Sequence, residues 1–155
     1  MRKTVEVQVP AKVNLQLSVG PKKADGYHEV VTVFQAISLM DTLKITHSDQ
    51  FGISIKGDYI NGVPLDQNNL VYKAVELMSE RFDTDKSVDI EIDKSIPVAG
   101  GMAGGSADAA ATLLGIDALY GLGLSKDELS EVASKLGSDV PFMLHGGTAV
   151  GRGRG

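Results

Sequence analysis

Cysteine is absent from the 155-residue sequence, and histidine occurs only three times. Without cysteine the chain can form no disulfide, no thiolate metal site and no cysteine nucleophile, although this absence alone does not fix the cell compartment. No two histidines stand in an HxxxH pair, which argues against a zinc site. These absences exclude thiol chemistry and disfavour structural zinc.

An excess of positive charge is missing as well. Lys and Arg number 15 against 20 Asp and Glu, which gives a net charge of −5. This balance argues against the broad basic surface with which proteins bind nucleic acids, because phosphate neutralisation dominates that affinity. A small anionic ligand is still compatible with it, since backbone amides and Mg²⁺ can neutralise phosphates locally.

Long apolar runs are also missing. No uninterrupted apolar stretch approaches the length that spans a membrane, and residues 1–4 lead into an alternating strand pattern rather than an apolar signal sequence. Hydrophobic residues make up 43% and charged residues 23%, so the chain suits one domain with a core of its own. We expect a cytoplasmic protein without membrane attachment.

Alternation of apolar and polar residues dominates the first third of the chain and predicts strands there. Over residues 13–19 the alternation places Leu15 and Leu17 on one face, opposite Lys12 and Asn14. A turn signal, Asp-Gly, follows before the next strand. The same reasoning predicts strands over residues 4–9, 29–37, 43–46, 53–56, 87–93 and 148–150.

Apolar periodicity and capping signals predict helices in the second half. Asn68 or Asn69 can cap the first helix, and Ser125 with Glu128 forms a capping box at a later one. Gly137 is a natural C-cap for that later helix. Strands first, then mixed strands and helices, predict an α+β two-layer domain.

The most informative stretch is the glycine-rich segment of residues 97–111. It connects a predicted strand at 88–92 with a strong helix former at 109–119. Glycines at a helix start leave bare amides at the positive end of the helix dipole, which is a typical phosphate site. The simpler interpretation is a tight connection whose glycines only provide positive φ angles. The glycines are Gly100, Gly101, Gly104 and Gly105.

Two familiar phosphate motifs do not fit this segment. A Walker A loop needs Lys after Gly105, where the chain has Ser106, and the dinucleotide fingerprint GxGxxG is absent. The segment therefore belongs neither to a P-loop NTPase nor to a Rossmann domain.

Two residues elsewhere could carry chemistry if they meet. Lys12 shares its strand face with Asn14, for which a solvated face is the simpler interpretation. Asp139 stands two residues before Pro141, so the local sequence favours a helix cap. Beside a phosphate loop, however, an Asp can accept the proton of an acceptor alcohol, and a Lys can stabilise developing charge. Periodicity does not show whether the two meet.

Four motifs occur in an order that is similar to a known family. They are Pro10–Leu15 (Pro-Ala-Lys-Val-Asn-Leu), Asp25–His28 (Asp-Gly-Tyr-His), the glycine-rich segment and Gly137–Phe142 (Gly-Ser-Asp-Val-Pro-Phe). Together they resemble the GHMP kinases over nearly the whole chain. Asp-Gly-Tyr-His after Pro-Ala-Lys-x-Asn points to the branch that phosphorylates a cytidylylated methylerythritol in the non-mevalonate route to isoprenoid precursors.

The resemblance implies a fold like the second domain of ribosomal protein S5, ATP and Mg²⁺ as cofactors, and a small-molecule substrate. It implies that Lys12 and Asp139 form the catalytic pair, with Asp139 as general base toward the 2-hydroxyl and Lys12 as its electrostatic partner. Asn14 would lie close to the reacting groups. Tyr27 and His28 would bind the cytosine by stacking and hydrogen bonds, although both also suit an ordinary hairpin.

The resemblance also implies that the glycine-rich segment holds the ATP phosphates, with Ser106 near the phosphates or Mg²⁺. Asn69 would lie near the adenosine, although it equally suits a helix cap. Asp108 is expected to act only as a carboxylate near the helix dipole. The expected ATP-binding residues of the segment are Pro97, Val98, Ala99, Gly100, Gly101, Met102, Ala103, Gly104, Gly105, Ser106 and Ala107.

Kinases of this family carry a second domain with another glycine-rich motif, and the sequence ends at Gly155 without either. The resemblance therefore implies that residues 1–155 are the N-terminal, ATP-binding half, with weak or no turnover alone. Two alternatives stay open. One is a GHMP kinase for homoserine or mevalonate, and the other is a non-catalytic module related to the RNA-facing domain of a ribosomal protein, against which the acidic charge argues.

Overall fold

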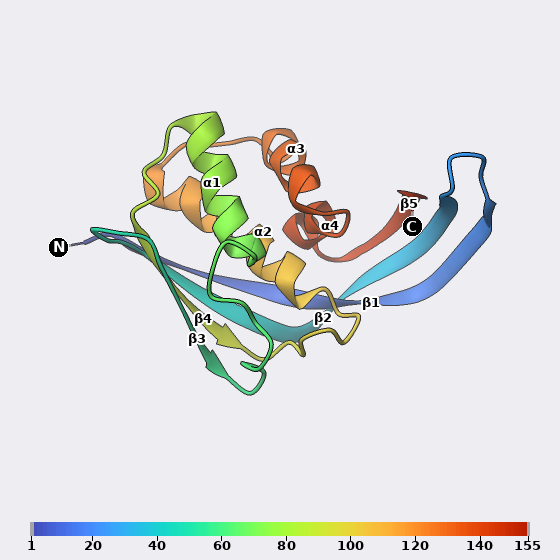
Figure 1. Cartoon of the computed structure of the whole chain (residues 1–155), viewed down its shortest axis with the longest axis horizontal. Coiled ribbons are helices and arrows are strands. Elements are labelled where there is room, and N and C mark those ends of the chain that lie inside the picture. The colour runs from blue at the N-terminus through green and yellow to red at the C-terminus, as the bar shows by residue number, and fades with distance from the viewer. Residues whose placement is uncertain (1, 155) are drawn as a thin grey trace.

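A five-stranded sheet with four helices on one of its faces forms the fold of residues 2–154, which the computed structural model describes (Figure 1). The strand order is β1-β2-β4-β3, and β5 pairs with β2. The predicted α+β two-layer class is confirmed. The elements are β1 (Thr4–Lys22), β2 (His28–His47), β3 (Gly52–Gly57), α1 (Leu70–Phe82), β4 (Val88–Lys94), α2 (Gly104–Tyr120), α3 (Lys126–Leu136), α4 (Val140–His145) and β5 (Thr148–Arg154).

Both long strands run through positions where the sequence predicts an interruption. The strands predicted at 4–9 and 13–19 are one strand, β1, and those at 29–37 and 43–46 are one strand, β2. Pro10 is tolerated because β1 is an edge strand whose register shifts just after it. The prediction of separate strands is wrong, because pairing between β1 and β2 continues past the proline.

A β-bulge in β1 changes which side chains share a face. Asn14 pairs with Phe34, whereas Leu17 pairs with Thr32, so β1 contains one extra residue at Leu15. Phe34 and Thr32 are two apart on β2 and share a face, which brings Leu17 onto the face of Asn14. The predicted separation of Leu17 from the polar face is therefore wrong, because one inserted residue reverses the alternation beyond it.

The second neighbour of β2 changes along its length. Residues Thr42–His47 pair with β4, whereas Glu29–Gln35 pair with β5. The β1–β2 hairpin, residues 13–22 and 28–35, extends beyond the helices and is called the hairpin arm below (Figure 1). The strand predicted at 148–150 is confirmed and continues along the arm as β5.

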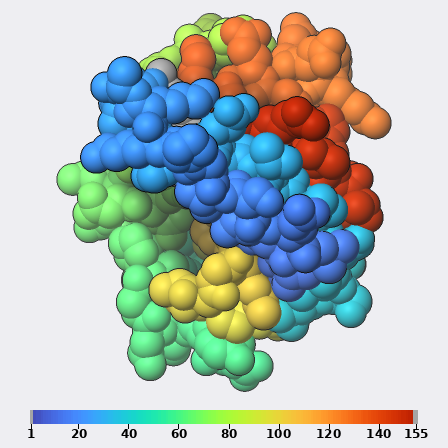
Figure 2. All heavy atoms as spheres, turned by 90° about the vertical axis from the view of Figure 1, so that its right-hand side faces the viewer, coloured from blue at the N-terminus to red at the C-terminus, as the bar shows by residue number. Residues whose placement is uncertain are grey.

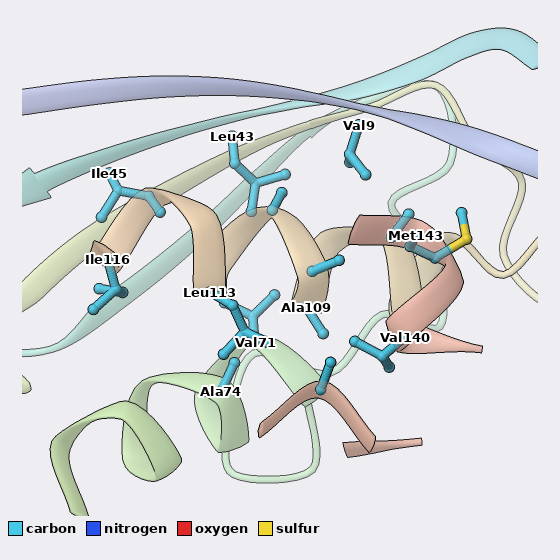
Figure 3. Close-up of a cluster of buried hydrophobic side chains, with 14 of the residues drawn as sticks. Val9, Leu43, Ile45, Val71, Ala74, Ala109, Leu113, Ile116, Val140 and Met143 are labelled. Carbon is cyan, nitrogen blue, oxygen red and sulfur yellow. The ribbon is translucent and has the colours of Figure 1, made fainter. Parts of the chain in front are cut away.

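The central helix, α2, is apolar around its circumference because both sides are covered. Leu43 and Ile45 of the sheet lie on one side of it, and Val71 of α1 lies on the side of Leu113 (Figure 3). Gly115 permits the close approach to the sheet, since a Cβ there would overlap the side chain of Ile45. Packing of α2 therefore fixes where its N-terminus meets the glycine-rich segment.

The helix boundaries confirm some signals and correct others. Asn69 caps α1, and the predicted capping box begins α3. Helix α2 begins at Gly104 rather than at 109, so Gly104 and Gly105 form its first turn. Gly137 is the C-cap of α3, as predicted, although it is extended at φ 167° rather than left-handed. Among residues 2–154, none of the helices combines the length and apolar composition of a membrane crossing.

Candidate active site

The first turn of α2 has backbone amides without partners in the described structure. Its N-cap residue, Ala103, lies in the left-handed region at φ 57°, and no side chain caps the helix. The amide of Ala107 is bonded to the Ala103 carbonyl at 2.8 Å. The three amides before it, of Gly104, Gly105 and Ser106, have no intrahelical acceptor. With the positive end of the helix dipole, they form a site suited to an anion.

An open cavity of about 340 Å³ lies over this turn and is called the loop cavity. The glycine-rich segment forms most of its lining, and the two predicted catalytic residues, Lys12 and Asp139, also border it. In Figure 2 the yellow glycine-rich segment lies between the blue strand β1 and the green segment that precedes α1. An anion on the first turn of α2 would therefore face both side chains.

Within the glycine-rich segment, three of the residues expected to bind ATP do not border the loop cavity. Val98 lines a neighbouring cavity instead. Met102 contributes its carbonyl, which accepts the backbone N–H of Lys12 at 3.2 Å. Ala107 is fully buried in the core, so it has no surface for a ligand.

Lys12 is 5% exposed, and its ammonium is bonded only to neutral groups. Nζ donates to Asn14 Oδ1 at 2.7 Å and to the Gly101 carbonyl at 3.0 Å, and it lies 5.5 Å from the centre of the Phe34 ring. None of the ion pairs formed within residues 2–154 includes Lys12. Its charge is therefore left for an incoming anion.

Asp139 occupies the N-cap position of α4, but its side chain makes no capping bond. The local expectation of a helix cap is wrong, because Asp139 adopts the helical conformation at φ −88° and ψ −17° instead of the extended one that capping uses. The carboxylate is partly exposed and forms no ion pair with Lys12 in the described structure. It is thus available on the border of the loop cavity.

A second hollow of about 330 Å³ lies between the hairpin arm, β5 and the two residues that precede α4, and it is called the arm groove. Lys12 and Asp139 border it too, so the pair stands where the loop cavity and the arm groove meet. Asn14 lines the groove and donates from Nδ2 to Thr32 Oγ1 at 2.6 Å. Because of the bulge in β1, Leu17 also lines it.

A third cavity, of about 180 Å³, lies between the start of α1 and the glycine-rich segment and is called the side cavity. Asn69 lines it and is 8% exposed. Its Oδ1 accepts the amide of Val71 at 2.9 Å, and its Nδ2 donates to the Pro64 carbonyl at 2.8 Å. Asn69 is therefore a helix cap that also forms a cavity wall.

Tyr27 and His28 lie near the tip of the hairpin arm, beyond the residues that line the arm groove. Tyr27 is 47% exposed. Nδ1 of His28 lies 2.7 Å from the Gly20 carbonyl. Since a carbonyl only accepts, Nδ1 carries a proton, and in the neutral form of such a ring Nε2 is the acceptor.

Two carboxyl groups and an ammonium are buried together beneath the start of α2, and the sequence analysis missed this arrangement. Lys94 Nζ donates to Asp41 Oδ2 at 2.6 Å and to Asp108 Oδ2 at 2.9 Å. The exposed fractions are 0%, 2% and 3% for Asp41, Lys94 and Asp108. Asp108 is thus no surface carboxylate, and the expectation of a mere dipole partner is wrong.

Burial and the neighbouring Asp41 raise the pKa of Asp108 well above its usual range, against the opposing charge of Lys94. Burial also raises the pKa of Asp41, but hydrogen bonds from Asp108, Lys94 and Ile96 outweigh it and lower that pKa. Burial lowers the pKa of Lys94, yet the two carboxyl groups raise it overall. Of the two carboxyl groups, Asp108 is therefore the one whose protonated form is favoured on folding, whereas the charged forms of Asp41 and Lys94 are favoured.

Alternation along β4 could have revealed Lys94. Val88, Ile90, Ile92 and Lys94 all lie on the buried face of this strand. A lysine in register with three core positions needs a buried acidic partner. No comparable signal identifies Asp41, because its burial depends on the long-range pairing of β2.

Neither the three cavities nor the rest of residues 2–154 contains a group of three His, Asp or Glu side chains that could hold a metal ion. Mg²⁺ commonly uses few protein ligands and keeps water and substrate phosphates in its coordination shell. A magnesium ion that arrives with a phosphate ligand does not require such a group of side chains.

Known proteins are similar to this chain in sequence. The family model for the GHMP kinases N terminal domain matches residues 69–147. The chain is 56% identical to 4-diphosphocytidyl-2-C-methyl-D-erythritol kinase of Rhodococcus jostii (strain RHA1), over 97% of this chain and 49% of that protein. It is 54% identical to the protein of the same name from Kineococcus radiotolerans, over 98% of this chain and 48% of that protein. The chain thus spans about half the length of these curated relatives.

Solved structures are similar over the same range. A crystal structure of 4-(cytidine 5'-diphospho)-2C-methyl-D-erythritol kinase aligns with a TM-score of 0.76 and 40% identity, covering 96% of this chain and 52% of that one. Mevalonate kinase of Methanococcus jannaschii aligns with a TM-score of 0.69 over 97% of this chain and 54% of that one. Its 18% identity supports the shared fold alone.

Proposed function

The chain belongs to the GHMP kinases, and from this premise we propose that it is the N-terminal, ATP-binding half of a 4-diphosphocytidyl-2-C-methyl-D-erythritol kinase. The identity of 56% to a relative with that name supports this substrate over homoserine or mevalonate. In this proposal a second domain, which the relatives are long enough to include, completes the enzyme.

One observation carries the proposal: Lys12 and Asp139 border both the loop cavity and the arm groove. A kinase needs the phosphoryl donor and the acceptor alcohol on either side of its reacting groups, roughly in line. ATP phosphates on the first turn of α2 and an alcohol in the arm groove would meet at this pair. ATP, with Mg²⁺, supplies the transferable phosphoryl group.

The chain's own residues then have distinct tasks. Asp139 accepts the proton of the 2-hydroxyl as its oxygen attacks, because its carboxylate caps no helix and faces the groove. Lys12 stabilises negative charge on the transferred group, since no carboxylate neutralises it in the resting structure. Asn14 holds the Lys12 ammonium in place through the 2.7 Å bond.

The acceptor's cytosine would lie near the tip of the hairpin arm. The acceptor is extended, so its alcohol can reach Asp139 while its base contacts Tyr27 and His28. Nε2 of neutral His28 accepts a hydrogen bond, which suits the exocyclic amino group of cytosine. Asn69 would border the adenosine in the side cavity.

ATP consumption with three candidate acceptors tests the proposal. Two proteins are compared. One is the 155-residue chain, and the other is an extended chain in which the second half of the Rhodococcus jostii relative follows residue 155. We expect turnover with the cytidylylated methylerythritol in the extended chain, and little in the shorter one. Turnover with mevalonate or homoserine but not with the cytidylylated methylerythritol would show that the proposed acceptor is wrong. RNA binding without any turnover would favour a non-catalytic module.

A further inference from the structure

The loop of residues 97–103, which is the part of the glycine-rich segment before α2 and is meant by the segment below, is attached at both ends to one buried ammonium. Lys94 is the last residue of β4, which enters the segment, and Asp108 lies in the second turn of α2, which leaves it. The ammonium donates to Asp108 at 2.9 Å and to Asp41 of β2 at 2.6 Å. Buried ionic groups hold their positions firmly, because each is costly without its partners.

Asp41 also holds the backbone that enters the segment. Its Oδ1 accepts the amides of Ser95 and Ile96 at 2.7 and 2.8 Å, directly before the segment begins at Pro97. One carboxylate therefore bonds both the Lys94 side chain and the adjoining main chain. The entry to the segment is fixed to the sheet through β2.

The first turn of α2, which follows the segment, packs against the same Lys94 ammonium. A Cβ on Gly104 would lie 3.0 Å from Lys94 Nζ, so the first turn of α2 packs directly against the ammonium. Asp108, one turn further on, bonds it from the same helix. The position of the first-turn amides of α2 therefore depends on the position of the Lys94 ammonium.

The segment between these ends needs such support. Ala99 and Ala103 both lie in the left-handed region at φ 57°, where an L-residue costs about 1 kcal/mol or more. Residues persist in such conformations only when the surrounding structure imposes them. Within the segment, the Gly101 and Met102 carbonyls bind Lys12, so support at the two ends has to come from elsewhere.

We propose that Asp41, Lys94 and Asp108 are positioning residues that hold both ends of the glycine-rich segment, so that the first-turn amides of α2 converge on one nucleotide phosphate. This inference rests on the proposed function, because that function makes the ligand a nucleotide. The three groups act through the segment and leave the chemistry to Lys12 and Asp139. Loss of the triad therefore weakens nucleotide binding in a chain that is still folded.

The test compares three variants of residues on α2. Asp108→Ala removes a partner of Lys94, and Asp108→Asn keeps an oxygen acceptor of nearly the same shape. Thr112→Val is the matched control, because Thr112 is 0% exposed on the same helix and bonds only the Asp108 carbonyl through its hydroxyl. The dissociation constant of a non-hydrolysable ATP analogue is measured by calorimetry in the 155-residue chain, and circular dichroism confirms that each variant is folded.

We expect Asp108→Ala to weaken binding roughly tenfold or more, by analogy with the cost of small displacements in a site. Asp108→Asn should restore most of that affinity, and Thr112→Val should leave it unchanged while lowering the unfolding midpoint. Wild-type affinity in folded Asp108→Ala, or an equal loss in Thr112→Val, would overturn the inference. Should Asp108→Ala fail to fold, Asp108→Ser, whose hydroxyl is too short to reach Lys94, has the same expected result.

A second measurement separates this inference from the proposed function. Amide hydrogen exchange of residues 95–106 without any nucleotide should become faster in Asp108→Ala and stay unchanged in Thr112→Val. A wild-type chain that binds no ATP analogue would refute the proposed function and the nucleotide part of the inference together. Binding by the wild-type chain with unchanged exchange in Asp108→Ala would refute the positioning role alone.

Discussion

Two buried lysines contact the glycine-rich segment, and they differ in what neutralises them. Lys94 is enclosed by two carboxyl groups, both of which bond its ammonium. Lys12 is nearly as buried, at 5% exposure, yet its ammonium bonds an amide oxygen and a carbonyl. A buried charge that has its counter-charge is costly to separate from it, whereas a buried charge without a counter-charge can attract an anionic ligand. From this comparison we infer a structural role for Lys94 and a catalytic role for Lys12.

Lys12→Met tests the chemical side of this comparison and has the largest expected effect. Turnover of the extended chain should fall by roughly 10³, similar to the share of a cationic side chain in other phosphoryl transfers. The free energy of unfolding should change by less than about 2 kcal/mol, since the two hydrogen bonds lost are offset by removal of a buried charge that has no counter-charge. Steady-state kinetics and urea unfolding measure the two quantities, and a large loss of stability with normal turnover would reverse the assignment.

Lys94→Met tests the architectural side. The free energy of unfolding should fall by about 3–5 kcal/mol, because Asp41 is left charged and buried without its counter-ion. Urea unfolding of Lys94→Met and Lys12→Met at the same pH gives a direct comparison. Equal losses in the two variants would show that neutralisation does not distinguish the lysines.

Asp108→Asn tests how the contribution of the Lys94 cluster to stability depends on pH. The pKa of Asp108 is raised on folding, so its contribution to stability is complete below the unfolded value near 3.8 and is lost as pH rises through the folded value. Asn does not titrate, so it lacks this dependence. The free energy of unfolding of the variant, relative to that of the wild type, should therefore rise with pH by at most about 1.4 kcal/mol per pH unit. Lys94 and Asp41 are the charged groups that face Asp108.

Urea unfolding of both proteins between pH 4.5 and 8 checks this expectation. The lowered pKa of Asp41 acts in the opposite direction, because its contribution is lost only as pH falls below about 3.8, outside this range. A stability difference that is independent of pH would show that Asp108 does not take up a proton on folding.

Asn14→Ala has the smallest expected effect. Loss of the 2.7 Å bond to Lys12 leaves the ammonium in place but less well oriented, so turnover should fall about tenfold, as expected for one hydrogen bond to a charged group. Gln16→Ala is the matched control on the same strand, because Gln16 is exposed and bonds only Ser18 through its side chain. An equal loss of turnover in the two variants would show that Asn14 has no specific role in the site.

Local signals predicted much of the fold, and they did so where each element has its own pattern. The Asn69 cap, the capping box of α3 and the alternation of β4 needed only neighbouring residues. The bulge at Leu15 and the continuity of β1 through Pro10 were missed, because both depend on pairing with β2. An alternating pattern cannot reveal an inserted residue that reverses it.

For the candidate site, the sequence predicted the residue types but only the fold shows which of them adjoin. Lys12 and Asp139 are 127 positions apart, and their shared place between two cavities follows from the packing of α4 against the sheet. Asp108 was misjudged, because its neighbours Lys94 and Asp41 come from two different strands. Tyr27 and His28 stay predictions, since the arm places them away from the groove.

A crystal structure of the 155-residue chain with a non-hydrolysable ATP analogue tests the central claim most directly. The account predicts phosphate oxygens within hydrogen-bond distance of the Gly104, Gly105 and Ser106 amides, with the terminal phosphate facing Lys12 and Asp139. Phosphates bound elsewhere on the surface, with this first turn of α2 still bare, would contradict it.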